Sequence, residues 1–239
     1  MSKMGTDNNW IKLIKKEEVC NLFNKLTIST KSITLFAGEN TIGKTATCLH
    51  LAKLAIDNGH SVLYFDTEEK IIDRPDPNLL ATFLQQNPKG FSNKFNIQNK
   101  LLNKVKQGKL DTSYFEQKIK ENKPVLVIID SIYTAFAQEF PEARRRAKVI
   151  GEFMLYLRPY MKQNNLAIII TSKTGRIVDR GEEKETILGG QELLYNCDVK
   201  AKMTTTHNNH KVKRVIFEVD QQQEFVLTVD YGGGLKESK

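Results

Sequence analysis

The chain has 239 residues, 40% of them hydrophobic, which predicts one folded domain and argues against wholesale disorder. Its apolar runs are far shorter than the roughly twenty residues of a membrane span, and Met1 to Trp10 lacks the hydrophobic core of a secretory signal. The net charge of +8 favours a polyanionic partner, although a lysine-rich surface without such a partner explains it equally well.

The cysteines and histidines show no pattern typical of a disulfide framework or a zinc site. The three cysteines are odd in number, far apart and without a C-x-x-C pair. Of the four histidines, His207 and His210 flank an Asn-Asn pair, which indicates a hairpin turn more than metal ligation. We therefore expect reduced thiols and a cytoplasmic, membrane-free protein.

The first predicted element is a helix from Asn8 to Asn24. Its apolar residues recur at mostly helical spacing among lysines and glutamates: Trp10, Leu13, Ile14, Cys20 and Phe23. We expect this amphipathic helix to lie on the core or on a neighbouring subunit. The chain then divides into an N-terminal helical extension, residues 1–25, and a core, residues 26–239.

The central motif of the chain follows an apolar strand, Lys31 to Ala37, and precedes a helix, Thr45 to Asn58, that Gly59 ends. Its spacing, G-x-x-x-x-G-K-T, is typical of a phosphate-binding loop, in which backbone amides and the helix N-terminus face an anion. Lys44 would bind the β- and γ-phosphates, and the Thr45 hydroxyl would hold Mg²⁺. The predicted nucleotide-binding residues are Gly38, Glu39, Asn40, Thr41, Ile42, Gly43, Lys44, Thr45 and Ala46.

A second buried strand, Ser61 to Phe65, leads into a cluster of acidic residues. Among them, Glu68 lies where a carboxylate could orient water or accept its proton next to a γ-phosphate. The alternative is that Glu68 or Glu69 caps a helix. A third strand, Val125 to Ile129, is wholly apolar and ends in Asp130, which would support the Mg²⁺.

The segments between and after these strands are less clear. We expect a helix from Leu79 to Gln86 and two helices within Lys94 to Lys123, separated by Gly108. A long helix is predicted from Phe140 to Asn164 and a strand from Leu166 to Ile170. The polar segment from Lys173 to Thr186 has no periodicity, and it is either mobile or ordered by a ligand.

From Cys197 onward, apolar and polar residues alternate, which predicts antiparallel strands at one edge of the sheet. The earlier alternation of strands and helices predicts a mainly parallel sheet with helices on its faces. The fold class is therefore α/β, with a P-loop and antiparallel C-terminal strands.

In this order, the motifs resemble the ATPase core of the RecA superfamily, and most closely archaeal RadA and RadB recombinases and their paralogues. The likeness spans about residues 26–234. The segments that carry it are Phe36-Ala37-Gly38-Glu39, Tyr64-Phe65-Asp66-Thr67-Glu68, Ile128-Ile129-Asp130-Ser131, Ile170-Thr171-Ser172 and Leu188-Gly189-Gly190. The resemblance implies ATP bound between subunits and single-stranded DNA bound on loops.

The resemblance also implies roles for single residues. Lys44 and Glu68 would be catalytic, and Thr45 and Asp130 would hold Mg²⁺. An arginine at the start of the long helix matches Arg146, and two neighbours extend it to a basic triplet, for which a solvated helix face is the alternative. The DNA-binding residues implied are Arg144, Arg145 and Arg146, with Arg176 and Arg180 in the polar segment.

Two departures from the recombinase pattern are visible. Only some thirty residues precede the core, without a clear aromatic-alanine polymerisation motif. Ser172-Lys173 replaces the Asn-Gln pair of the family, so we hypothesise that Lys173 contacts the γ-phosphate directly. Both departures favour a RadB-like accessory paralogue over a self-sufficient recombinase.

We therefore expect an ATP- and Mg²⁺-dependent ATPase that binds single-stranded DNA and assists homologous recombination. It would act as a homo-oligomer or as a hetero-oligomer with a recombinase. Two alternatives stay open: a KaiC-like regulatory ATPase that acts on protein partners, and a non-enzymatic adaptor that uses ATP to hold an interface together.

Overall fold

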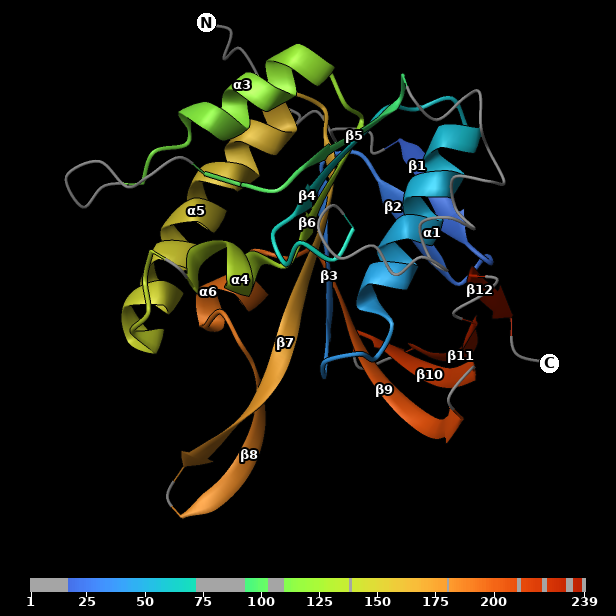
Figure 1. Cartoon of the computed structure of the whole chain (residues 1–239), viewed down its shortest axis with the longest axis vertical. Helices are drawn as coiled ribbons and strands as arrows, with labels where there is room; N and C mark the ends of the chain where they lie inside the picture. The colour runs from blue at the N-terminus through green and yellow to red at the C-terminus, as the bar shows by residue number, and fades with distance from the viewer. Residues whose placement is uncertain are drawn as a thin grey trace, which may run out of the picture.

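The protein is represented by a computed structural model that describes residues 17–71, 93–102, 110–137, 139–179, 181–209, 212–220, 223–230 and 234–237. Its centre is a ten-stranded sheet in the order β12-β11-β10-β9-β3-β7-β6-β4-β5, with β8 paired to β7 (Figure 1). The parallel part consists of β3 (Ser32–Gly38), β4 (Val62–Asp66), β5 (Phe95–Gln98), β6 (Leu126–Asp130), β7 (Ala167–Asp179) and β9 (Val199–Asn209).

The other strands of this sheet are antiparallel to their neighbours. They are β8 (Glu182–Ile187), which pairs with β7, and the C-terminal strands β10 (Val212–Val219), β11 (Gln223–Asp230) and β12 (Gly234–Glu237). This architecture confirms the predicted α/β fold with a mainly parallel sheet and antiparallel C-terminal strands.

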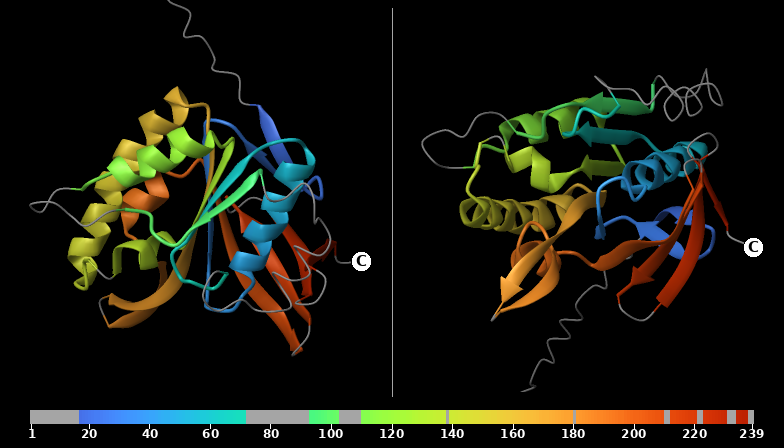
Figure 2. Two further views of the ribbon diagram at one scale, coloured as in Figure 1. Left: turned by 45° about the horizontal axis from the view of Figure 1, so that its top comes forward. Right: turned by 60° about the horizontal axis from the view of Figure 1, so that its bottom comes forward.

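Helices cover both faces of the sheet (Figure 2). One face packs on α1 (Lys44–Asp57), and the other packs on α3 (Ser113–Asn122), α4 (Ile132–Ala137), α5 (Ala143–Gln163) and α6 (Gln191–Tyr195). Because side chains alternate along a strand, Phe36 joins the α1 side of the core while Leu35 and Ala37 join the α5 side. Burial on both faces explains why the central strands are mostly apolar.

The predicted N-terminal helix is wrong where the structure describes it. Residues 18–29 form a hairpin of β1 (Glu18–Leu22) and β2 (Leu26–Ser29), and residues 8–16 lie outside the described part. Phe23 and Asn24 have positive φ angles of 49° and 57°, which turn the chain back on itself. The buried side chains of the hairpin pack into the α1 side of the core, and Asn58 Nδ2 donates a 3.0 Å hydrogen bond to the Val19 carbonyl.

Two further predictions for the middle of the chain are corrected by the structure. Two helices were predicted within Lys94 to Lys123, and the first of them is replaced by the edge strand β5. The second is present as α3, which is the one helix among the described residues of this segment. Gly108, the predicted boundary, lies outside the described residues. The polar segment after Ser172 is a β-hairpin, because β7 continues to Asp179 and β8 returns beside it. This hairpin projects from the body of the molecule (Figure 1).

The predicted helix from Leu79 to Gln86 lies outside the described residues. The predicted helices at Thr45 to Asn58 and Phe140 to Asn164 are confirmed within a few residues of their ends as α1 and α5. Over the described ranges, no helix combines the length and the apolar character that a membrane crossing requires.

Candidate nucleotide-binding site

The phosphate loop connects β3 to α1 and is packed tightly at both of its glycines. A Cβ atom on Gly38 would lie 2.6 Å from the carbonyl oxygen of Met203, which leaves no room for a side chain. Gly43 has a φ of 111°, in the region that favours glycine. Between them, Glu39, Asn40 and Thr41 are exposed and Ile42 is buried in the core, as is Ala46 in the first turn of α1.

Lys44 lies inside this loop. Its Nζ donates hydrogen bonds to the carbonyl oxygens of Gly38 at 2.8 Å and Glu39 at 2.7 Å, and the residue is only 6% exposed. Burial, reinforced by the neighbouring Lys70, lowers the pKa of Lys44 to about 8, although Asp130 and Glu68 oppose this shift. The loop thus holds one cation at the N-terminus of α1, where an anion is favoured.

Asp130, at the end of β6, joins three strands at the same edge of the sheet. Its Oδ2 accepts hydrogen bonds from Thr45 Oγ1 at 2.6 Å and from the Tyr64 hydroxyl at 2.9 Å. Its Oδ1 accepts one from Thr171 Oγ1 at 2.5 Å, and Asp130 is almost fully buried. A single carboxylate beside a threonine hydroxyl fits Mg²⁺, which prefers oxygen ligands and is commonly shared with phosphates.

Glu68 lies on the turn after β4 and is surrounded by donors. Its Oε1 accepts hydrogen bonds from Ser131 Oγ at 2.7 Å and Thr134 Oγ1 at 3.0 Å. Lys70 Nζ lies 2.5 Å from Oε2, and Lys173 Nζ lies 3.2 Å from Oε1. Burial would raise the pKa of Glu68, but Lys70, Ser131 and Lys173 together lower it to about 2.

Lys70 is a site residue that the sequence interpretation missed. Burial lowers its pKa, but Asp130, Glu68 and Asp66 outweigh burial, so the net shift of the pKa is upward. The Asp66 carboxylate fixes the surrounding turn by accepting hydrogen bonds from the backbone amides of Lys70 at 3.1 Å and Ile71 at 2.6 Å. The available signal was its position two residues after Glu68, on the rim where ligands gather in open α/β sheets.

The structure therefore brings together five residues that were predicted from distant parts of the sequence. They are Lys44, Thr45, Glu68, Asp130 and Lys173. Among the described residues, no group of three or more histidine, cysteine or acidic side chains is arranged to hold a metal by itself.

Burial raises the pKa of the Cys20 and Cys197 thiols to about 12.

The predicted DNA-binding arginines have different surroundings. Arg144 and Arg145 are exposed in the first turn of α5, and the Arg145 guanidinium lies 5.4 Å from the centroid of the Phe140 ring. Arg146 is only 7% exposed, because it lies 4.2 Å over the Tyr133 ring and donates a 3.2 Å hydrogen bond to the Pro141 carbonyl. The three neighbours are therefore not equivalent.

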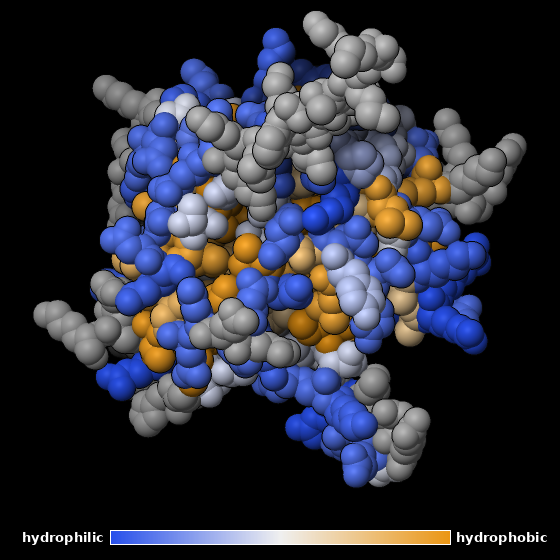
Figure 3. All heavy atoms as spheres, turned by 180° about the vertical axis from the view of Figure 1, so that it is seen from behind, coloured by the Kyte–Doolittle hydropathy of each residue, from blue (hydrophilic) through white to orange (hydrophobic). Residues whose placement is uncertain are grey.

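The other two predicted DNA contacts belong to the β7–β8 hairpin. Arg176 is exposed and lies 3.3 Å from Glu183 across the hairpin, while Arg180 lies outside the described residues. Seen from behind, the projecting hairpin is hydrophilic, and hydrophobic areas lie on the body of the molecule above it (Figure 3). The hairpin offers polar groups to a ligand and little apolar surface.

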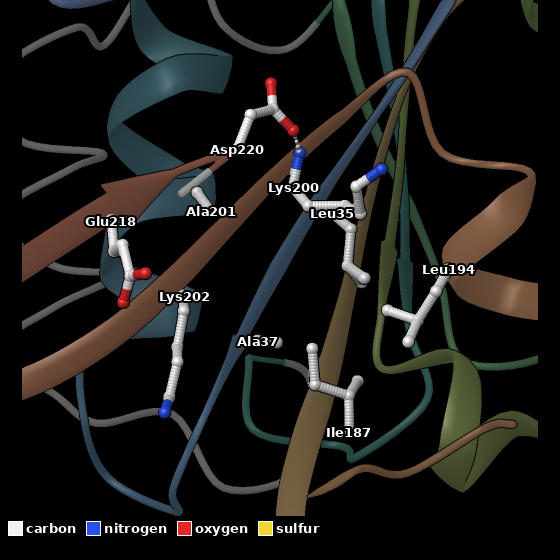
Figure 4. Close-up of a pocket in the computed structure, with 9 residues that line it drawn as sticks. All are labelled: Leu35, Ala37, Ile187, Leu194, Lys200, Ala201, Lys202, Glu218 and Asp220. Atoms are coloured by element: carbon white, nitrogen blue, oxygen red, sulfur yellow. Dashed lines mark hydrogen bonds between the residues drawn. The ribbon is translucent and has the colours of Figure 1, made fainter. Parts of the chain in front are cut away.

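A pocket of about 450 Å³ lies on the face of the sheet that α5 and α6 share. Its apolar wall consists of Leu35, Ala37, Ile187 and Leu194, and β9 and β10 supply its charged side (Figure 4). There the Lys200 amide donates a 3.1 Å hydrogen bond to Asp220. The lining comes from β3, β8, α6, β9 and β10 with its following turn, and residues 38–45 of the phosphate loop are not part of it.

Comparison with known proteins agrees with the order of these motifs. Residues 16–218 match the family model described as Rad51. A curated relative, the DNA repair and recombination protein RadB of Methanosphaera stadtmanae, is 25% identical over 199 residues, which covers 76% of this chain and 80% of the relative. The family match covers most of the chain, including both glycines of the phosphate loop, Glu68 and Asp130. The chain belongs to the Rad51 family.

Proposed function

We propose that this protein binds and hydrolyses ATP, binds single-stranded DNA and assists homologous recombination as an accessory member of its family. The observation that carries the proposal is the hydrogen bond from Thr45 to Asp130, which joins the phosphate loop to the strand end that carries the acidic residue. Members of the Rad51 family are ATPases that bind DNA, which supports both activities.

The chemistry follows from the residues around this hydrogen bond. Lys44 and the amides at the start of α1 would bind the phosphates, and Thr45 and Asp130 would hold Mg²⁺. Bound Mg²⁺ would neutralise charge on the phosphate oxygens. Glu68 would orient the attacking water and accept its proton, because it is the carboxylate next to Ser131 at the same edge of the sheet.

Exposed cations support the DNA-binding part of the proposal. Arg144, Arg145 and Arg176 are exposed, and the chain as a whole carries a charge of +8. Binding of phosphates by such residues gives affinity without base specificity and makes that affinity strongly dependent on salt. The curated relative is named a DNA repair and recombination protein, which favours DNA over a protein partner as the target.

One set of measurements on the full chain tests this function. ATP hydrolysis is measured with and without Mg²⁺ and single-stranded DNA, and labelled single-stranded DNA is titrated at physiological salt. Turnover together with saturable DNA binding supports the proposal. Turnover without DNA binding would indicate a regulatory ATPase with protein partners, and nucleotide binding without turnover would indicate an adaptor. Sizing the protein with each ligand tests whether it assembles with itself.

A further inference from the structure

Both oxygens of the Glu68 carboxylate are occupied in this structure. Oε1 receives the hydroxyls of Ser131 and Thr134 and lies 3.2 Å from Lys173 Nζ, while Oε2 lies 2.5 Å from Lys70 Nζ. A carboxylate in this state is a poor proton acceptor, because its lone pairs are engaged and its charge is balanced by two cations. Some of these interactions have to break before Glu68 can take a proton from water.

Lys70 is the partner best placed to leave. Its backbone is fixed, since the Asp66 carboxylate accepts hydrogen bonds from the amides of Lys70 and Ile71. Its side chain is 45% exposed, whereas the Glu68 side chain is only 8% exposed. The ammonium group can therefore change partners by rotating flexible, partly solvated bonds, while the turn beneath it and the carboxylate stay in place.

The lysines around Glu68 favour an anionic ligand. Lys44, Lys70 and Lys173 gather at one edge of the sheet, where the facing carboxylates are Glu68, Asp130 and Asp66, and Asp66 also accepts hydrogen bonds from backbone amides. Lys70 and Lys173 share Glu68, and Lys44 lies inside the phosphate loop, so a phosphate bound at the loop would compete with Glu68 for these cations. Because Lys70 and Lys173 both pair with the single charge of Glu68, one of them can turn to a phosphate while Glu68 keeps a cation.

We propose that Lys70 is a nucleotide-binding residue that exchanges Glu68 for the terminal phosphate of a bound nucleoside triphosphate, and so releases Glu68 for its role as proton acceptor. This inference rests on the proposed function and adds a cation from the same chain that distinguishes a triphosphate from a diphosphate. A diphosphate lacks the terminal phosphate, so with it Lys70 remains on Glu68.

Equilibrium binding of two nucleotides tests this exchange without relying on hydrolysis. Fluorescent ADP and a fluorescent non-hydrolysable ATP analogue are titrated, with Mg²⁺, into the wild type, Lys70→Met and Lys70→Arg. Lys70→Met should weaken binding of the analogue by about tenfold or more, as expected when a charge-assisted hydrogen bond is removed, and leave ADP affinity unchanged. Lys70→Arg keeps a cation and should restore most of the affinity for the analogue.

Lys118→Met is the matched control, because Lys118 forms an ion pair with Glu121 at 2.8 Å on α3 and should change neither affinity. Equal weakening of ADP and the analogue by Lys70→Met, or no weakening of either, would overturn the exchange. If the wild type binds neither nucleotide, the proposed function fails and this inference fails with it. If the wild type binds both nucleotides, and Lys70→Met prefers the analogue over ADP as strongly as the wild type does, the proposed function survives and the exchange alone is wrong.

Discussion

Thr45 Oγ1 donates a 2.6 Å hydrogen bond to Asp130 Oδ2 across 85 residues of sequence. The bond joins the N-terminus of α1 to the end of β6, and it places a hydroxyl and a carboxylate side by side. Both groups are oxygen donors of the kind that Mg²⁺ binds. The pair is therefore the part of the structure from which the cation requirement can be tested directly.

Replacing Asp130 with asparagine should raise the Mg²⁺ concentration needed for half-maximal ATP hydrolysis by about tenfold or more, because a neutral amide is a weaker ligand than a carboxylate. The measurement is a Mg²⁺ titration of turnover at fixed ATP. Asp57→Asn is the control, since Asp57 pairs with Lys53 on the exposed side of α1. An unchanged Mg²⁺ requirement in Asp130→Asn would remove Asp130 from the cation site.

Glu68→Gln should reduce the rate of ATP hydrolysis by about 10²-fold or more while nucleotide binding is retained, because an amide cannot accept a proton from water. Single-turnover hydrolysis and nucleotide titration separate the two effects. Glu69→Gln is a close control, since Glu69 is exposed on the same turn. Equal turnover in Glu68→Gln and the wild type would assign the proton acceptor elsewhere.

The pH dependence of stability should reveal the ion pairs of Glu68. Its pKa is lowered from 4.5 to about 2 in the folded chain, so its contribution to stability is present above pH 4.5 and is lost as the pH falls towards 2. We expect the wild type to be more stable than Glu68→Gln by about 2 kcal/mol near neutral pH, with the difference shrinking over this acid range. Urea unfolding at several pH values measures it, and a difference that is constant with pH contradicts the assignment.

Within the basic triplet of α5, we expect Arg144 and Arg145 to contribute to DNA binding and Arg146 to contribute to stability. Alanine at Arg144 and Arg145 should weaken binding of single-stranded DNA and reduce the slope of its affinity against salt, by about one unit for each phosphate that is no longer bound, without changing the melting temperature. Alanine at Arg146 should lower stability by about 1 kcal/mol, because this side chain is packed over Tyr133. DNA titrations over a salt series and thermal unfolding test both, and an unaltered slope would place the DNA surface elsewhere.

Lys173 tests the link between the hairpin and the nucleotide. It lies on β7 at the base of the hairpin, 3.2 Å from Glu68. If Lys173 contacts the γ-phosphate directly, Lys173→Gln should reduce affinity for a triphosphate analogue about tenfold and make turnover more dependent on single-stranded DNA. Hydrolysis rates measured with and without DNA decide this. If neither the rate nor its DNA response changes, the hypothesis for Lys173 is wrong.

How far sequence alone could lead is clear from particular elements. The phosphate loop and the strand ending in Asp130 were predictable, because glycine spacing and a continuous apolar run depend on short-range chemistry. The hairpin at Glu18–Ser29 was not predictable, because the spacing of its apolar residues also fits a helix. The turn at Phe23 and Asn24, which makes the hairpin, is visible only in the structure. The extended β7–β8 pair was hidden because β8 carries charge and is mostly exposed, which removes the alternation expected of a half-buried strand.

The site shows the same division between local and long-range information. Lys44, Thr45 and Glu68 belong to recognisable motifs. Lys70, by contrast, is placed beside Glu68 by the folded turn, in which the Asp66 carboxylate accepts hydrogen bonds from the backbone amides of Lys70 and Ile71. In the same way, no local pattern separates Arg146 from its neighbours until Tyr133 lies beneath it. Side chains whose partners are fixed by the folded turn were therefore the ones that sequence interpretation missed.

The two glycines of the phosphate loop rest on strands from the far end of the chain. The space beside Gly38 is filled by Met203 of β9, and a Cβ atom on Gly43 would lie 3.1 Å from Val229 of β11. On the ribosome, residues 38–45 are synthesised long before these strands, so the nascent loop lacks its packing contacts with β9 and β11. Nucleotide therefore cannot guide the folding of this loop before β9 and β11 have been made, and competence to bind it depends on the docking of these strands.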